Sequence, residues 1–244
     1  MKKISLITVY NNKDKLKEML DSATIQKNVE IDYVLIDNTE NTFLSASSAL
    51  NFGVRQSAGD VLCFSHQDIV FLDDSQLNKI YDYAINNPNT IFGPAGVVSR
   101  EKDKTAPMLS SMCEGEYKSR YNSLTSPSDC FTLDECLIVC HRSCMEKISF
   151  DEVVCDGWHL YGVDLCLQAH LTNEINVVAF PMNIWHKSHG NTDKAYFITL
   201  NKVADKYKDS FKQINSTNGY IYTNPIRRTL QNIYRSVKYR DLLK

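Results

Sequence analysis

The chain has 244 residues, of which 43% are hydrophobic and 23% are charged, and its net charge is −2. This composition excludes a disordered or membrane-embedded chain, and the near-neutral charge predicts no nucleic-acid partner. No apolar run approaches the ~20 residues that span a bilayer, and the N-terminus lacks a small-residue cleavage site. We therefore expect a cytoplasmic protein.

Eight cysteines occur in this chain without an export signal, a setting in which thiols normally stay reduced. Cys136, Cys140 and Cys144 recur every four residues, but no C-x-x-C pair with a second half indicates a zinc site. We expect the cysteines to be small core residues.

The first part of the chain alternates short apolar runs with segments of helical spacing. The pattern predicts strands at 4–10, 32–37 (buried), 61–64 and 90–92, and helices at 13–23, 45–58 and from residue 74 or 75 to just before Pro88. Strands that alternate with helices imply parallel βαβ units, in which ligands bind beyond the carboxyl ends of the strands. The predicted fold class is α/β, a single domain with a mostly parallel central sheet flanked by helices.

The second part of the chain begins with a different texture. Residues 100–129 are polar with little periodicity, which predicts a long loop that could act as a lid. Beyond it the pattern predicts strands at 131–140 and 175–180 and helices at 161–171 and 193–208. We expect the domain to cover residues 1–223, with a nucleotide-binding half at 1–98.

A metal-capable segment follows the strand at 61–64. Neither G-x-G-x-x-G after the first strand nor G-x-x-x-x-G-K-[ST] occurs, which argues against a dinucleotide oxidoreductase and a P-loop enzyme. His66 and Asp68 are two residues apart in an extended segment, so their side chains point to the same side at the carboxyl edge of the sheet. An imidazole and a carboxylate there can hold a divalent cation against a diphosphate.

Three segments in order, ISLITVYNN, VLIDN and ALNFGVRQSAGDVLCFSHQD, resemble the family 2 glycosyltransferases and the wider A-type nucleotide-diphospho-sugar transferases. The resemblance implies transfer of a sugar from a nucleotide diphosphate sugar, most often UDP-linked, to an acceptor hydroxyl. It implies that residues 99–223 form an acceptor-binding half. The implied donor-binding residues are Thr8, Tyr10, Asp37, Asn51, Gly53 and Gln67. His66 and Asp68 stand at the two acidic positions of the family's D-x-D, which implies Mn²⁺ or Mg²⁺ as cofactor.

The segment FDEVVCDGWHLYGVDLCLQAH resembles a subgroup of the same family. The family's general base, which deprotonates the acceptor hydroxyl, maps onto Asp164. The commoner E-D pair is missing, because Tyr161 and Gly162 stand where it would fall, so Asp156 remains a rival. One base and one metal suggest direct displacement with inversion.

A second segment, IWHKSHG, resembles the later H-x-S-x-G of that subgroup. The late histidine often completes the metal site in the family, which maps onto His186, with His189 as second choice. Each assignment has a structural alternative: Asp68 and Asp37 as turn formers, His66 as a turn histidine, and Asp164 as a helix N-terminal carboxylate.

The acceptor side has weaker candidates. Asp134 and Glu135 interrupt the apolar run at 131–140, and adjacent carboxylates in a strand cannot both face one core, so at least one should face the cleft and touch the sugar or acceptor. Trp158 and His159 could shape the acceptor pocket, although an aromatic side chain is more often a core residue. Two alternatives to a glycosyltransferase remain: a sugar-nucleotide-binding relative without turnover, and another metal-dependent phosphotransferase.

The C-terminal segment 226–244 combines six basic residues and one acid with apolar residues at helical spacing. We expect residues 224–244 to form a basic amphipathic helix. Such a helix can lie on an anionic membrane surface, at the inner face of the cell membrane, or pack on the domain with its basic face in water, and both readings stay open. The family resemblance implies bacterial surface polysaccharide or glycoconjugate synthesis, with a glycan or lipid-linked acceptor.

Overall fold

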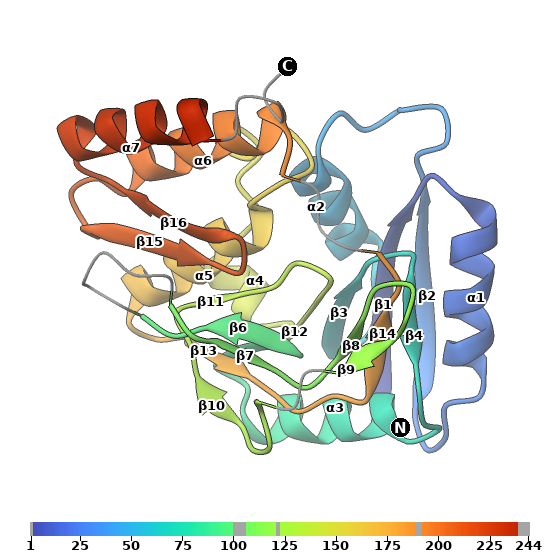
Figure 1. Cartoon of the computed structure of the whole chain (residues 1–244). Coiled ribbons are helices and arrows are strands. Elements are labelled where there is room, and N and C mark those ends of the chain that lie inside the picture. The colour runs from blue at the N-terminus through green and yellow to red at the C-terminus, as the bar shows by residue number, and fades with distance from the viewer. Residues whose placement is uncertain (1, 100–105, 121–122, 189–191, 239–244) are drawn as a thin grey trace.

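The computed structural model describes residues 2–99, 106–120, 123–188 and 192–238, and its centre is a seven-stranded sheet with the order β10-β13-β5-β12-β3-β1-β2 (Figure 1). The strands of this sheet are β1 (Lys3–Tyr10), β2 (Glu30–Asp37), β3 (Val61–Ser65), β5 (Thr90–Gly93), β10 (Ser128–Asp129), β12 (Leu137–His141) and β13 (Asn176–Ala179). All run in one direction except β10 and β12, which are antiparallel to their neighbours. The predicted α/β class with a mostly parallel central sheet is confirmed.

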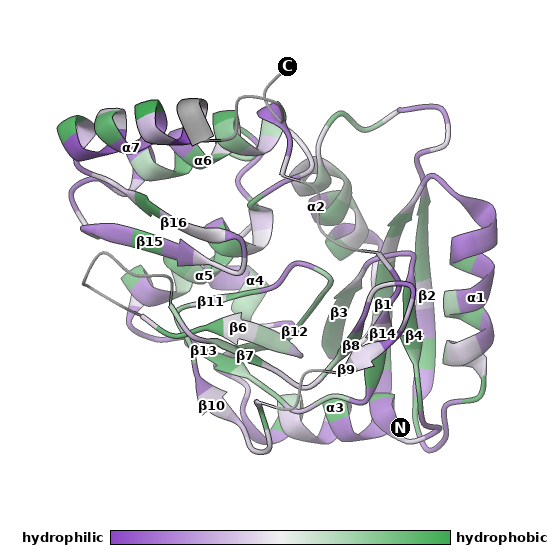
Figure 2. Ribbon diagram, in the orientation of Figure 1, coloured by the Kyte–Doolittle hydropathy of each residue, from purple (hydrophilic) through white to green (hydrophobic). Residues whose placement is uncertain are grey.

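Helices cover both faces of this sheet. The described helices are α1 (Lys13–Thr24), α2 (Ala46–Gln56), α3 (Gln76–Asn86), α4 (Cys144–Lys147), α5 (Tyr161–Thr172), α6 (Lys194–Lys206) and α7 (Pro225–Lys238), of which α7 packs against β16 instead of the central sheet. Alternate residues of β3 face opposite sides: Leu62 and Phe64 pack with α2, α5 and α6, whereas Val61 and Cys63 pack with α1 and α3. The apolar central strands in Figure 2 are thus buried on both faces.

Smaller sheets complete the fold and were not predicted. They contain β4 (Ile69–Phe71), β6 (Ala95–Val97), β7 (Met108–Ser110), β8 (Cys113–Glu114), β9 (Ser119–Arg120), β11 (Thr132–Leu133), β14 (Ile184–His186), β15 (Gln213–Ser216) and β16 (Gly219–Tyr222). Strands of two to four residues are too short to carry a period-2 pattern, which explains why sequence reasoning missed them. The segment 100–129, expected to be a loop, contains β7, β8 and β9 of the smaller sheets and β10 at the edge of the central sheet. Its residues 100–105 and 121–122 lie outside the described part.

Two predicted strands differ in detail from those observed. The strand expected at 131–140 is split into β11 and β12, because Asp134 Oδ1 accepts the backbone N–H of Cys136 at 3.0 Å and turns the chain. The strand β2, expected to be buried, is an edge strand whose Tyr33 and Leu35 are each 38% exposed. By contrast, all eight cysteines are buried and free, as predicted. Within the described ranges, no helix combines the length and the apolar character that crossing a bilayer requires.

Candidate functional site

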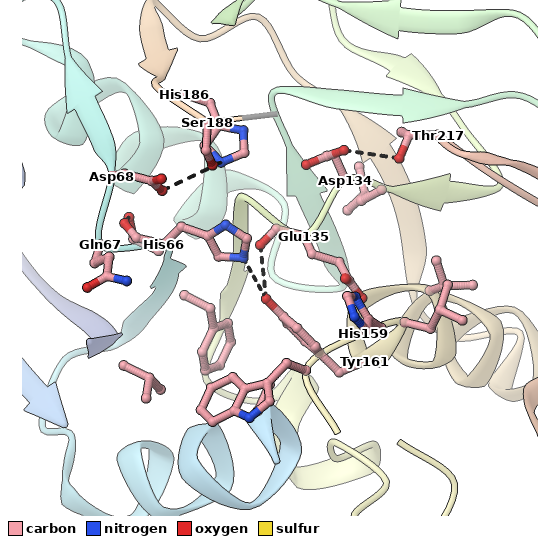
Figure 3. Close-up of a pocket in the computed structure, with 18 of the residues that line it drawn as sticks. His66, Gln67, Asp68, Asp134, Glu135, His159, Tyr161, His186, Ser188 and Thr217 are labelled. Carbon is pink, nitrogen blue, oxygen red and sulfur yellow. Dashed lines mark hydrogen bonds and ion pairs between the residues drawn. The ribbon is translucent and has the colours of Figure 1, made fainter. Parts of the chain in front are cut away.

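A pocket of about 800 Å³ opens at the carboxyl ends of β1, β2 and β3 (Figure 3). Because β12 runs antiparallel to β3, the residues that precede β12 reach the same edge of the sheet. The turn before α5 and the end of β14 close the remaining sides. The segment 100–129, which the sequence predicts to be a long loop, also contributes Met108, Ser110, Glu114 and Ser123 to the wall of the pocket.

Three side chains that can bind a metal converge in this pocket. His66, Asp68 and His186 each offer a ligand atom, and these atoms all lie within 4.8 Å of one another. Strand β14 brings His186 to the site because it pairs with β4, with His186 opposite Ile69. Residues 66–68 form a turn, closed by a 3.4 Å hydrogen bond from Ile69 N to His66 O, and are not the extended segment that we expected. The turn nevertheless directs both side chains into the pocket.

The charges in this cluster suit a divalent cation. Burial alone would raise the pKa of Asp68, but the hydrogen bond and positive charge of His186 outweigh it and hold the pKa well below its usual value. Burial lowers the pKa of His66 to about 4, so its imidazole is neutral at pH 7. His186 Nδ1 is buried and has no hydrogen-bond partner among the described residues. An ionised carboxylate and a neutral imidazole are ligands that a divalent cation accepts, and His186 completes the set in its unprotonated form.

Tyr161 connects this cluster to the opposite wall. Its hydroxyl lies 2.8 Å from His66 Nε2 and donates to the backbone oxygen of Glu135 at 3.3 Å (Figure 3). Glu135 Oε1 in turn accepts the backbone N–H of Gly162 at 2.9 Å. Burial is the main cause that raises the pKa of Glu135 to about 8. Glu135 is therefore a partly protonated carboxyl group beside the metal-capable cluster.

The adjacent carboxylates Asp134 and Glu135 both line the pocket, although a continuous strand would have pointed them to opposite faces of the sheet. The break between β11 and β12 permits this arrangement. Asp134 Oδ2 accepts the hydroxyl of Thr217 at 3.0 Å, while its other oxygen caps Cys136 N. Asp134 is thus fixed by two hydrogen bonds.

The donor-side residues expected from the sequence fall into two groups. Tyr10 and Gln67 line the pocket, and Asp37 lies next to it, where its Oδ2 accepts the hydroxyl of Tyr10 at 2.9 Å. Gln67 Oε1 accepts the backbone N–H groups of Asn11 and Asn12 at 3.1 and 2.8 Å, which ties the turn after β3 to the turn after β1.

Thr8, Asn51 and Gly53 do not line the pocket. Thr8 is fully buried in β1. Asn51 holds Phe150 O at 2.8 Å, and a Cβ at Gly53 would lie 2.5 Å from the side chain of Ile7. Their places in the sequence therefore reflect the packing of α2 on the sheet, which sequence reasoning did not distinguish from ligand binding.

The acceptor-side candidates lie at the rim. Trp158 lines the pocket and is 43% exposed. His159 also lines it, and its Nε2 lies 3.3 Å from Asp193, with its ring against Tyr196 at 5.7 Å between centroids. Both residues come just before α5, and the neighbouring Gly157 O accepts the backbone N–H of Ala46 at the start of α2 at 2.9 Å.

Asp164, the expected general base, does not line the pocket. It is fully buried in α5, and its carboxylate contacts Lys206 Nζ at 2.6 Å, the Tyr207 hydroxyl at 2.9 Å and Gln168 Nε2 at 2.7 Å. This position does not suit a base, because the carboxylate is fully buried outside the pocket, where it joins α5 to Lys206 and Tyr207 at the end of α6. The rival Asp156 also lies outside the pocket, in an ion pair with Lys202. His189 lies outside the described residues.

Several lining residues were not singled out as ligands from the sequence. The side chain of Lys15 reaches Asp68 Oδ2 at 3.2 Å from the first turn of α1. Ser188 Oγ lies 3.2 Å from His186 Nε2, and Glu114 enters from β8, which pairs with β14. A lysine in the helix that follows the first strand was a usable signal, because that helix starts at the carboxyl edge of the sheet.

Comparison with known proteins finds a matching family and solved structures with a similar fold. Residues 40–149 match the family described as Glycosyl transferase family 2. The crystal structure of S. aureus TarS is similar with a TM-score of 0.54 and 13% identity, over 86% of this chain and 40% of that chain. S. aureus TarS 1–349 in complex with UDP-GlcNAc is similar with a TM-score of 0.54 and 12% identity, over 86% of this chain and 67% of that chain.

The chain thus spans 40% of the first of these structures and about two thirds of the second. No curated protein sequence matches the chain. At these identities the likeness concerns the fold, and the family match adds the segment that contains the metal-capable turn. Residues 40–149 therefore match the family 2 glycosyltransferases, and the fold of the chain is the A-type fold that it shares with TarS.

Proposed function

We propose that this protein is a glycosyltransferase that moves a sugar from a nucleotide diphosphate sugar to an acceptor hydroxyl. The observation that carries the proposal is the convergence of His66, Asp68 and His186 in a pocket of about 800 Å³ at the carboxyl edge of the sheet. Open α/β sheets bind nucleotides at this edge, and the pocket volume is in the range that small-molecule sites occupy.

The nucleotide belongs on the side formed by residues 1–98. Tyr10 and Asn38 line that side, Gln67 fixes the turn beneath it, and Asp37 orients Tyr10. Lys15 adds a positive charge next to Asp68, where a diphosphate would need one. The TarS structure with UDP-GlcNAc shares the fold, which supports UDP as the nucleotide.

A divalent cation, Mn²⁺ or Mg²⁺, would be held by His66, Asp68 and His186. Such an ion would neutralise the negative charge that grows on a departing diphosphate. The protein's own side chains prepare the site: the ionised Asp68 faces the neutral His66, and Tyr161 holds the His66 ring by its Nε2.

The acceptor belongs on the side formed by residues 99–223. The exposed ring of Trp158 and the imidazole of His159 are suited to contact a sugar ring, and Asp134 offers a carboxylate fixed by hydrogen bonds in the same pocket. A hydroxyl that attacks the anomeric carbon opposite the diphosphate displaces it in one step, so we infer inversion of configuration.

We further propose that α7 binds an anionic membrane surface, as a lipid-linked acceptor in bacterial surface glycan synthesis would require. The large apolar side chains of α7 point away from the protein: Ile226 is 74%, Leu230 64% and Ile233 56% exposed. Its polar side chains Arg228 and Gln231 contact the domain instead. An outward apolar stripe on a helix with four basic and no acidic residues is the pattern of an interfacial helix.

Thermal unfolding with a panel of nucleoside diphosphates and their sugars, with and without Mn²⁺, tests the central proposal. A ligand at 100 times its dissociation constant adds about 2.7 kcal/mol of stability. We expect one sugar nucleotide to raise the melting temperature in a Mn²⁺-dependent way and to be converted with release of the intact nucleoside diphosphate. Release of inorganic phosphate would instead indicate a phosphotransferase, and the absence of any shift would refute the proposal.

A further inference from the structure

Four carboxylates line the described pocket, and their surroundings differ. Asp68 pairs with His186, and Glu114 reaches the same side from β8. Asp134 has both oxygens committed, one to Cys136 N and one to Thr217. These three are therefore engaged by the metal-capable cluster or by the fold around residues 134–136 and 217, whereas the fourth, Glu135, accepts hydrogen bonds from backbone N–H groups at the start of α5.

Glu135 is held by the backbone at the start of α5. Its Oε1 accepts Gly162 N at 2.9 Å, and Leu160 immediately before the helix adopts a left-handed conformation with φ 64°. This turn points the first amide groups of α5 toward the carboxylate, and a helix N-terminus stabilises a negative charge nearby. Burial opposes that charge and is the stronger effect, since it raises the pKa of Glu135 to about 8. A carboxylate whose pKa lies near the working pH is a good proton acceptor.

The position of residue 162 explains how this side chain can be accommodated. A Cβ at Gly162 would lie 3.0 Å from Glu135 Cγ and 2.6 Å from Ile138 Cδ1. The Glu135 side chain thus occupies the space that a side chain at position 162 would need. The carboxylate of Glu135, which precedes β12, therefore takes the place that a side chain at position 162 of α5 would hold.

Glu135 is also placed next to the donor side. The hydroxyl of Tyr161 bridges His66 Nε2 at 2.8 Å and the Glu135 backbone oxygen at 3.3 Å, which ties residue 135 to the metal-capable cluster. The rim residues Trp158 and His159 lie on the same stretch that leads into α5. Glu135, Trp158 and His159 thus line the same pocket as the metal-capable cluster.

We propose that Glu135 is the catalytic base of this protein. The inference rests on the proposed glycosyl transfer. The acceptor O–H proton passes to the Glu135 carboxylate while the acceptor oxygen forms a bond to the anomeric carbon. The bond from that carbon to the diphosphate oxygen breaks, and its electron pair leaves with the nucleoside diphosphate.

The experiment uses the full chain with Mn²⁺ and with UDP-GlcNAc, UDP-glucose or GDP-mannose as donor. It measures donor binding and the rate at which the nucleoside diphosphate is released when water acts as the acceptor. For the donor that the wild type takes, we expect Glu135→Gln to lower the release rate ~10² to 10⁴-fold, the usual worth of a general base. Its donor dissociation constant should change less than about twofold, because a base that acts on the acceptor contributes little to donor binding. Glu146→Gln, an exposed glutamate on α4, is the matched control and should match the wild type.

A second pair of variants separates lost chemistry from lost shape. Glu135→Ala clears the space beside Gly162, and adding Gly162→Asp then returns a carboxylate from the helix side, whose Cβ requires the end of the Ile138 side chain to shift. We expect the double variant to release nucleoside diphosphate at least about tenfold faster than Glu135→Ala alone. A double variant that binds donor but is no faster would overturn the inference.

The inference and the proposed function can fail separately. If the wild type turns over a donor and Glu135→Gln does so within threefold of the wild-type rate, Glu135 is not the base. If the wild type neither binds nor hydrolyses any sugar nucleotide in the panel, the glycosyltransferase proposal fails, and the role of Glu135 fails with it.

Discussion

At the scale of single residues, Asp68 is the most constrained side chain of the site. It is 5% exposed and contacts Lys15 and His186, which both carry or can carry positive charge. A buried carboxylate in such a setting stays ionised over the whole physiological range. It therefore supplies a permanent negative charge for a cation, whichever sugar nucleotide the pocket accepts.

Replacing Asp68 by Asn tests that role. Asp68→Asn keeps the size of the side chain and removes the charge, so we expect the Mn²⁺-dependent rise in melting temperature to disappear. Donor affinity in the presence of Mn²⁺ should fall at least about tenfold, or ~1.4 kcal/mol. Titration calorimetry with Mn²⁺ alone gives a readout that does not depend on turnover.

His141→Gln is the matched control for the cluster, because His141 lies on β12 outside the pocket and contacts Ser143. Unchanged Mn²⁺ binding in this variant, with loss in Asp68→Asn and His186→Ala, would locate the cation. Full Mn²⁺ binding in Asp68→Asn would show that the cation site is elsewhere.

The pH dependence follows from Glu135. A base must be unprotonated, and the pKa of Glu135 is raised to about 8, so kcat/KM should rise with pH and level off above about pH 8. The titratable groups that face Glu135 are Asp134, Tyr161, Tyr196, Cys155 and Cys166. The pKa values of the two phenols and two thiols are raised, mainly by burial, so these groups stay neutral over this range. A pH profile of the residual activity of Glu135→Gln that keeps the same rise would assign it to another group.

The same shift affects stability with a defined sign. Because the folded-state pKa of Glu135 lies above its usual 4.5, the folded protein binds the proton more tightly than the unfolded chain does. This contribution is complete below about pH 4.5 and is lost as the pH rises through 8. We expect Glu135→Gln to become more stable relative to the wild type between pH 5 and pH 9, which denaturant unfolding at several pH values will measure.

At the scale of secondary-structure elements, α5 separates two roles. Its N-terminal turn faces the pocket and holds Glu135, while its first acidic residue, Asp164, faces α6. Lys206 bridges Asp164 and Asp151 from α6, at 2.6 and 2.9 Å. Residues two positions apart on a helix point in different directions, so one short segment can serve both the site and the core.

Asp164→Asn should accordingly impair folding stability far more than donor binding. Removing one partner of a buried ion pair costs about 3 kcal/mol, at the lower end of the usual range because Lys206 keeps Asp151. Urea unfolding will measure this loss, and Asp156→Asn, which breaks only an exposed pair with Lys202, is the control. If Asp164→Asn instead keeps wild-type stability and abolishes turnover, Asp164 regains the role expected from the sequence.

At the scale of the whole molecule, α7 presents an amphipathic surface in an unexpected orientation. Its arginines Arg228 and Arg235 contact Asp205 and the backbone of Tyr220, so part of its basic character is used inside the fold. Its large apolar side chains, Ile226, Leu230 and Ile233, are exposed. A terminal helix that packed only to shield apolar surface would show the opposite orientation.

The membrane proposal predicts that α7 governs vesicle binding. The triple variant Ile226→Ser, Leu230→Ser and Ile233→Ser should lower the affinity for anionic phosphatidylglycerol vesicles at least about tenfold, because it removes the apolar surface that would enter the lipid interface. Sedimentation with vesicles measures the effect, and Ile25→Ser, an exposed isoleucine next to α1, is the control. Equal binding to neutral vesicles, or no binding by the wild type, would contradict the proposal.

Much of the fold could be predicted because its long elements carry local signals. Asn12, Ser45 and Asp193 cap helices as their residue types suggest, and β1 and β3 are apolar because both faces of the sheet are covered. The short strands carry too few residues for a pattern. The antiparallel insertion of β12 between β3 and β5 depends on contacts between distant segments, which no local signal encodes.

The sequence by itself determined the α/β class and the position of His66 and Asp68, because strand polarity places the end of the third strand of the βαβ pattern at the carboxyl edge of the sheet. The late histidine, His186, was implied by the family resemblance. Only the tertiary structure decided which carboxylates face the pocket. Asp164 and Glu135 are both carboxylates, and nothing in the sequence shows which of them faces the pocket. The break before β12 directs Glu135 into the pocket, whereas the packing of α5 against α6 turns Asp164 into the core. Side-chain direction at such positions is set by packing between segments far apart in the chain, so a linear pattern cannot specify it.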